Sequence, residues 1–177
     1  MQNYESKLVE SSKKLSDIMI SDIGDDPERF LEMYRLAVRD EYPLSMRAGG
    51  IIAKIANKHV CTVQKLIPEI IEILPSIKVE GVKRGFLKML IELPLEIDED
   101  LSGQLADLAF EWISDSKQAI AIRAYSMDII YNFSLKYHEI VPEFIAVLDE
   151  VGRNGSAGLK QRCRKMIDQL KMKLPDY

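Results

Sequence analysis

Two histidines and two cysteines have the widest chemical repertoire in this chain, since such side chains bind transition metals and transfer protons. His59 and Cys61 are close in sequence, whereas His138 and Cys163 lie far along the chain. A tetrahedral zinc site usually draws on ligands paired at fixed short spacing, and no such pairing occurs here. We therefore expect no metal site.

A group of aspartates, Asp22, Asp25 and Asp26, superficially suggests a calcium-binding loop. Such a loop alternates oxygen ligands over about 12 residues and closes on a glutamate, and that run is absent. Asp26 directly precedes Pro27, and this pair is typical of the first residues of a helix. Helix capping is therefore the better interpretation of Asp26.

The motifs of common enzyme classes are also missing. The sequence contains no glycine-rich phosphate loop, no nucleophile elbow and no spacing that suggests a catalytic triad. We expect a non-catalytic protein without catalytic residues and without a cofactor. A small-molecule enzyme stays an alternative, which would show a deep pocket holding a perturbed carboxylate or histidine.

Length and composition are those of an ordinary folded chain. The 177 residues are 47% hydrophobic and 29% charged, with a net charge of -4, which disfavours intrinsic disorder and polyanion binding by the chain as a whole. No run of about 18 uncharged apolar residues is present, so no membrane span is expected. The polar N-terminus lacks the core of a secretion signal, and two cysteines make no disulfide framework. These points favour the cytoplasm.

One arginine recurs along the chain at spacings of 37, 39 and 39 residues. A small residue follows each copy, and an apolar stretch with helical spacing comes next. A fixed period near 40 is the signature of helical repeats that must stack to bury their apolar faces. The copies are Arg47, Arg84, Arg123 and Arg162, followed by Ala48, Gly85, Ala124 and Cys163.

Apolar residues follow helical spacing almost throughout, and strand signals are missing. The first helix is expected over 4–23, and Pro27 opens the second. Arginine-bearing helices then alternate with partner helices through short connections, which favour antiparallel neighbours. The arginine-bearing helices are expected at 43–58, 79–93, 117–137 and 156–173, and their partners at 60–74, 98–114 and 139–151.

Two partner helices begin with an apolar pair, proline and glutamate (LIPE at 66–69, IVPE at 140–143). Together with the arginine period, this pattern resembles HEAT repeats, whose near relatives are armadillo-type repeats. The resemblance implies an all-α fold, a right-handed α–α superhelix (solenoid) of about four helix pairs. It implies a degenerate capping pair at 1–41, because a solenoid end has one face in water. Residues 42–177 would complete one solenoid domain, with units at 42–75, 78–115 and 117–152 and a final helix at 156–173.

The repeat arginines most simply tie one unit to the next. The small residues after them, with Gly49 and Gly50, would let helices approach closely. A row of arginines gripping an anionic partner is the alternative. HEAT units often carry an aspartate six residues before the arginine, which forms a ladder between repeats, and only the first of these positions is acidic here. The positions hold Glu41, Lys78, Lys117 and Ser156.

Charge separates between the two sets of helices. Basic residues outnumber acidic ones in every arginine-bearing helix, and acidic residues outnumber basic ones in every partner helix. In HEAT-like proteins the second helices line the concave surface, so the resemblance implies an acidic trough and a basic convex face. An acidic trough attracts basic segments and repels phosphate backbones. The alternative is a solvated face that only keeps the protein soluble.

The leading hypothesis is a protein-binding scaffold or adaptor for another protein or a basic peptide, with its oligomeric state left open. Phe110 is either a contact to the next repeat, which we favour, or a hydrophobic anchor in the trough. Trp112 shares an apolar stripe and is expected in the core. The candidate binding residues are Lys65, Glu69, Glu72, Asp107, Phe110, Glu111, Glu143, Asp149 and Glu150.

Nucleic-acid binding is the second hypothesis, since some HEAT-like proteins remove alkylated bases from damaged DNA. Those proteins need a basic concave surface with aromatic and acidic groups at its centre, and this chain is acidic overall. The basic helix at 156–173 either touches a nucleic acid or an acidic protein, or is only the polar cap of the array.

Overall fold

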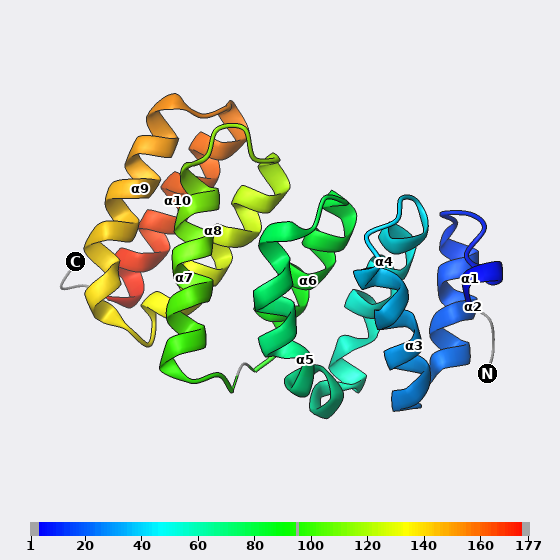
Figure 1. Cartoon of the computed structure of the whole chain (residues 1–177). Helices are drawn as coiled ribbons and strands as arrows, with labels where there is room; N and C mark the ends of the chain where they lie inside the picture. The colour runs from blue at the N-terminus through cyan, green and yellow to red at the C-terminus, as the bar shows by residue number, and fades with distance from the viewer. Residues whose placement is uncertain (1–3, 95, 175–177) are drawn as a thin grey trace. The chain divides into compact units, whose positions relative to one another are not determined.

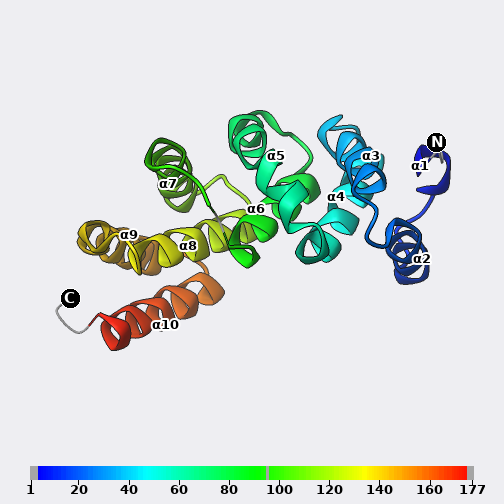
Figure 2. The ribbon, with the colours of Figure 1, turned by 90° about the horizontal axis from the view of Figure 1, so that it is seen from below.

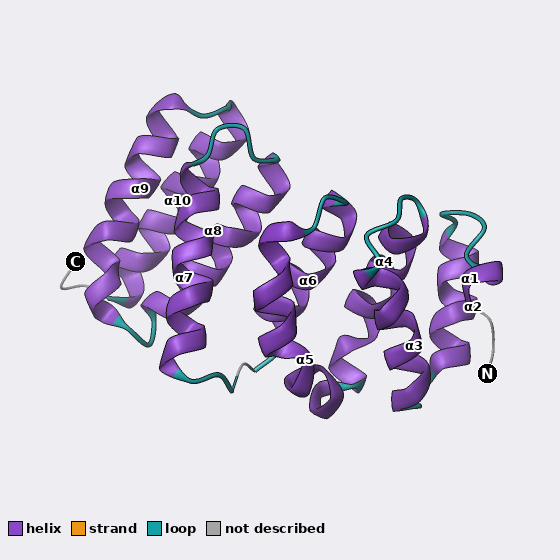
Figure 3. Cartoon of the chain, viewed as in Figure 1, coloured by secondary structure: helices purple, strands orange, loops and turns teal. Residues whose placement is uncertain are grey.

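The computed structural model describes residues 4–94 and 96–174, which fall into two compact units, Met1–Asp98 and Glu99–Tyr177. All regular elements in these ranges are α-helices or short 3-10 turns, without strands (Figure 3). The all-α fold expected from the sequence is thereby confirmed. Within the same ranges, no helix combines the length and the apolar character that crossing a bilayer requires.

The described part of the first unit contains six α-helices (Figure 1). Asp26 caps α3 as expected, because its carboxylate accepts the backbone N–H groups of Glu28 and Arg29 at 2.9 and 3.3 Å. The helices are α1 (Tyr4–Lys7), α2 (Lys13–Ile23), α3 (Pro27–Val38), α4 (Leu44–Ile55), α5 (Val60–Ile73) and α6 (Glu80–Glu92), with 3-10 turns Ala56–Lys58 and Leu74–Ser76 after α4 and α5.

The continuous helix expected over 4–23 is wrong, because residues 8–12 leave the helical path between α1 and α2. The Ser12 side chain accepts the backbone N–H of Leu15 at 3.1 Å, which is the bond of a helix N-cap. Serine hydroxyls compete for backbone N–H groups inside helices and favour caps instead. A new helix therefore starts at this point.

The helices of the first unit form two layers. α4 packs against α2, α3 and α6. Figure 2 shows α2, α4 and α6 on one side of the unit and α1, α3 and α5 on the other. The two arginine-bearing helices of this unit, α4 and α6, therefore share a layer. Fully buried side chains from both layers make up the core, among them Phe30, Ile52, Ile70 and Phe86.

Helices α4 and α6 approach closely at two glycines. A Cβ added at Gly85 would lie 2.7 Å from the carbonyl oxygen of Gly49, and one added at Gly49 would lie 3.2 Å from the Cα of Val82. The role of Gly85 in close helix approach is thus confirmed. Gly50 differs, because a Cβ there would meet nothing within 4 Å. The packing role expected for Gly50 is wrong.

The second unit contains four α-helices within residues 99–174, and α7 and α10 each pack against both α8 and α9. Accordingly α7 and α9 form one layer, and the arginine-bearing helices α8 and α10 form the other. Trp112 of α7 is buried in the core, as expected. The helices are α7 (Glu99–Ser114), α8 (Ile120–Ser134), α9 (Val141–Asn154) and α10 (Ala157–Lys173), with the 3-10 turn η3 (His138–Ile140) before α9.

Extensive packing joins three arginine-bearing helices to the helix before each of them: α4 to α3, α8 to α7 and α10 to α9. The boundary between the two compact units follows Asp98, inside the segment 78–115. The division into units at 42–75, 78–115 and 117–152 within one solenoid domain, and the concave position of the partner helices, stay predictions.

Candidate protein-interaction surfaces

Three candidate binding residues lie on α5 of the first unit, and Lys65, Glu69 and Glu72 are all exposed. None of them forms an ion pair with another described residue. Glu69 lies near the phenol of Tyr34 on α3. Burial of this phenol, followed by the negative charge of Glu69, raises the pKa of Tyr34. Glu69 therefore also faces the buried Tyr34 phenol, whereas Glu72 and Lys65 are exposed without an ion-pair partner among the described residues.

In the second unit, five exposed carboxylates lie on the adjacent helices α7 and α9, and we call them the acidic surface; one of them, Asp149, also lines a pocket with Lys160 and Arg164 of α10. None of the five forms an ion pair among the described residues. Phe110 is half-buried on α7, and its ring meets Phe144 of α9 edge-on, with centroids 6.2 Å apart. This ring therefore joins the two helices. The acidic surface consists of Asp107, Glu111, Glu143, Asp149 and Glu150.

Helix α10 of the second unit is rich in exposed cations. Five exposed cationic side chains project from α10, whereas the segregation of charge between whole layers stays a prediction. Each layer also holds charges of the other sign, since Arg153 is exposed on α9 and Asp168 is exposed on α10. The basic side chains are Lys160, Arg164, Lys165, Lys171 and Lys173.

A pocket of about 340 Å³ opens between α7, the end of α8 and η3. Phe133 and Tyr137 line it with their rings edge to face at 6.3 Å, and Glu99 and Glu139 add negative charge. The ammonium group of Lys136 lies 4.7 Å from the centroid of the Tyr137 ring. Hydrogen bonding to Lys136 lowers the pKa of Tyr137. An aromatic ring at this pocket thus already accommodates one cation.

Three repeat arginines, Arg47, Arg123 and Arg162, bond to backbone carbonyls. The Arg47 guanidinium donates to the carbonyl oxygen of Leu8 at 2.7 Å and to the hydroxyl of Ser11 at 3.1 Å. Arg123 is buried, and its Nε donates to the carbonyl oxygen of Ile113 at 2.9 Å. Arg47 therefore joins α4 to the segment before α2, and Arg123 joins α8 to the end of α7.

Arg162 and Arg84 have contrasting surroundings. The Arg162 guanidinium of α10 donates to both carboxylate oxygens of Asp128 on α8 at 2.6 Å, and to the carbonyl oxygen of Ala124 at 3.2 Å. Arg84 is exposed, with no hydrogen bond or ion pair to another described residue. One sequence position in the repeat therefore serves different contacts in different copies.

Asp40 makes a contact between the turn after α3 and the segment before α6 that the sequence reasoning missed. Its carboxylate oxygens accept the backbone N–H groups of Lys78 and Val79, each at 2.8 Å, just before α6 begins. Asp40 itself has a positive φ of 56°, a conformation that aspartate tolerates better than most residues. The available signal was the separation of 38 residues between Asp40 and Lys78, which is close to the arginine period.

The histidines and cysteines are not gathered into a site. His59 is buried, stacks on Phe30 with ring centroids 4.6 Å apart, and holds its Nε2 3.0 Å from the carbonyl oxygen of Gly24. Cys61 is exposed and Cys163 is buried, and burial raises the pKa of the Cys163 thiol. Among the described residues, no group of three or more such side chains and carboxylates could hold a metal ion.

These observations define the class of protein: an all-helical protein whose consecutive helices pack in layers. The family model described as a HEAT repeat domain matches residues 5–170. Since this match spans most of the chain, the protein belongs to the HEAT repeat domain family, which commonly mediates protein interactions. Comparison with curated proteins and with solved structures gave no match.

Proposed function

We propose that the protein is a non-catalytic scaffold whose acidic surface docks a basic peptide or helix of a partner protein. The observation that carries this proposal is the acidic surface itself: five exposed carboxylates on two adjacent helices, unpaired within the described residues. Unpaired exposed carboxylates speed the approach of a basic partner and favour its correct orientation.

The aromatic pocket beside η3 supports the same proposal. It borders α7, which carries part of the acidic surface, and its walls combine aromatic rings with the carboxylates of Glu99 and Glu139. A lysine or arginine of the partner can place its aliphatic stem on such rings and its charged head near the carboxylates. The pocket would then anchor the peptide that the surrounding charge attracts.

Charge reversal tests the proposal. We expect a fluorescent, lysine-rich amphipathic peptide to bind the whole chain, and the double variant Asp107→Lys/Glu111→Lys to weaken this binding by about tenfold or more, because two attractions become repulsions. Fluorescence anisotropy at two salt concentrations measures the effect, and binding to the original chain should weaken as salt rises.

The matched control is Asp17→Lys/Asp25→Lys, which changes the net charge equally at exposed positions of α2 and of the turn that follows it, in the other unit. This control should bind the peptide nearly as tightly as the original chain. Equal losses in both double variants, or equally tight binding of an acidic peptide, would contradict a specific acidic docking surface.

Nucleic-acid binding is the alternative function, and the five exposed basic side chains of α10 are the observation that favours it. Lysine and arginine along one helix can contact successive phosphates, and such binding weakens steeply with salt. A mobility-shift titration with duplex DNA at low salt separates the two functions. Tight, salt-sensitive binding that is lost in Lys165→Glu/Lys171→Glu would support the alternative.

A further inference from the structure

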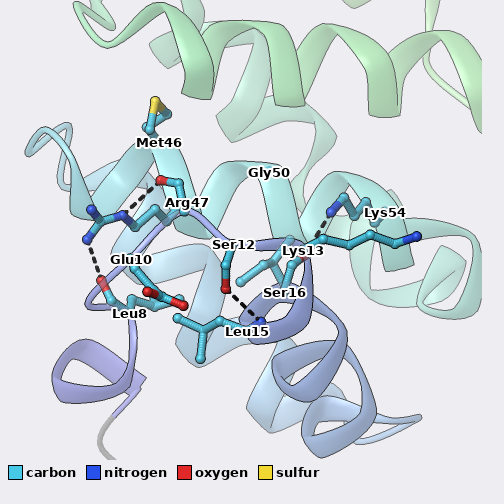
Figure 4. Close-up of a pocket in the computed structure, with 12 residues that line it drawn as sticks. Leu8, Glu10, Ser12, Lys13, Leu15, Ser16, Met46, Arg47, Gly50 and Lys54 are labelled. Atoms are coloured by element: carbon cyan, nitrogen blue, oxygen red, sulfur yellow. Dashed lines mark hydrogen bonds between the residues drawn. The ribbon is translucent and has the colours of Figure 1, made fainter.

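A pocket of about 370 Å³ opens between α2, α4 and the segment 8–12 (Figure 4). Three cationic side chains and three serine hydroxyls line it, and Glu10 is the one acidic residue in its wall. The cations come from both helices, so the charge is assembled by the fold. The cationic residues are Lys13, Arg47 and Lys54, and the serines are Ser11, Ser12 and Ser16.

Neutral partners hold two of these cations. Arg47 donates from Nε to the hydroxyl of Ser11 at 3.1 Å, and the Lys54 ammonium donates to the hydroxyl of Ser16 at 2.8 Å. Neither these two cations nor Lys13 form an ion pair with another described residue. Hydroxyl partners orient a cation without cancelling its charge, so the pocket retains an excess of positive charge.

Gly50 lies at the floor of this pocket. Figure 4 shows it on α4 between the side chains of Arg47 and Lys54, because these positions follow the i, i+3, i+7 spacing of one helix face. Glycine inside a helix is destabilising relative to alanine. Close packing does not explain it here, since a Cβ at Gly50 would meet nothing within 4 Å. The missing side chain leaves the space between the two cations open.

We propose that this pocket binds a phosphate group, as inorganic phosphate or as the phosphomonoester of a small molecule. A phosphate dianion presents several acceptor oxygens, which match a guanidinium fork, ammonium groups and hydroxyl donors. The anion sits over Gly50, with Arg47 on one side and Lys54 on the other. The hydroxyls of Ser11 and Ser16 then donate to the anion while still accepting from their cations.

An NMR titration of the whole 15N-labelled chain tests this proposal. Sodium phosphate and O-phosphoserine are added separately, with ionic strength held constant by sodium chloride. We expect saturable shifts of the backbone amide signals of residues 11–16 and 47–54. Equal affinities would show that the phosphate dianion suffices, and tighter binding of phosphoserine would identify a phosphomonoester. Shifts that do not saturate, or that sodium chloride alone reproduces, would overturn the proposal.

Two glycine variants separate binding from folding. Gly50→Leu places a strong helix former at an open position, so α4 should still fold. The leucine side chain fills the space between the cations. Phosphate affinity should therefore fall by about tenfold or more, which corresponds to the loss of one charged hydrogen bond. Gly103→Leu is the control, because Gly103 of α7 is equally open and lies in the other unit. The control should bind phosphate unchanged. Undiminished binding by Gly50→Leu would overturn the proposal.

Discussion

Replacing Gly85 with alanine is expected to lower the free energy of unfolding by about 1–3 kcal/mol, the usual cost of overpacking a tight contact. The added Cβ would lie 2.7 Å from the carbonyl oxygen of Gly49, which is backbone and cannot rotate away. Helices α4 and α6 would have to separate, and the buried side chains between them, such as Phe86, would lose contacts. Urea denaturation followed by circular dichroism measures the change.

The variant Gly50→Ala is the matched control for this experiment. It makes the same chemical change inside α4, but the new methyl group would meet nothing within 4 Å. Only the gain in helix propensity then remains, and we expect stabilisation by about 0.5–1 kcal/mol. If Gly85→Ala also stabilised the protein, the close crossing of α4 and α6 would be contradicted.

Removing the guanidinium of Arg162 is expected to destabilise the protein by about 1–3 kcal/mol at neutral pH. Asp128 and Arg162 are both partly buried, and Arg162→Met leaves the carboxylate without its charged partner, a penalty typical of an uncompensated hydrogen-bonded charge. Burial raises the pKa of Asp128, and Arg162 opposes this shift without cancelling it. The variant should therefore show a still higher pKa for Asp128.

The pH dependence of the stability lost in Arg162→Met shows whether the ionised Asp128 causes that loss. A carboxyl with a raised folded-state pKa binds protons more readily in the folded than in the unfolded state. The free-energy cost that its negative charge imposes on the folded state therefore falls as pH drops through the folded-state pKa. The stability deficit of Arg162→Met should therefore shrink between pH 7 and about pH 5. Adding Asp128→Asn should remove most of the pH-dependent part. A deficit that stays constant with pH would show that the ionised Asp128 is not its source.

Helix positions were largely predictable because their signals are local. The starts and ends expected for α6, α7 and α10 lie within one residue of those observed, since the apolar spacing lies within each helix and, for α10, the capping residue Ser156 directly precedes it. The break at 8–12 was not foreseen, because apolar spacing continues across it and only the cap at Ser12 marks a new start.

Contacts between helices were less predictable, because they join backbone groups that lie far apart along the chain. The carboxylate of Asp40 reaches the N–H groups of Lys78 and Val79 only when the turn after α3 and the segment before α6 are both in place. Gly85 and Gly50 look alike in sequence, yet one touches a neighbouring backbone and the other faces open space.

Exposure of the candidate site was predictable in part. Outward carboxylates follow from helical periodicity, and the acidic surface contains five of the expected residues. The pocket beside Arg47 was hidden, because its serines Ser11 and Ser16 appear separate from α4 until the chain turns back against that helix. The aromatic pocket was hidden likewise, since Phe133 and Tyr137 meet α7 only through folding.

The cap that Asp40 supplies has a consequence for how the first unit melts. The carboxylate comes from the turn after α3, whereas the N–H groups that it accepts precede α6. Fraying at the start of α6 therefore also releases that turn, and loosening of the turn uncaps α6. Adjacent repeats in a solenoid are coupled through such nearest-neighbour terms. The α3–α4 hairpin and the start of α6 should consequently open as one cooperative group. Hydrogen exchange at the amides of Lys78 and Val79 should then report the opening of the α3–α4 turn.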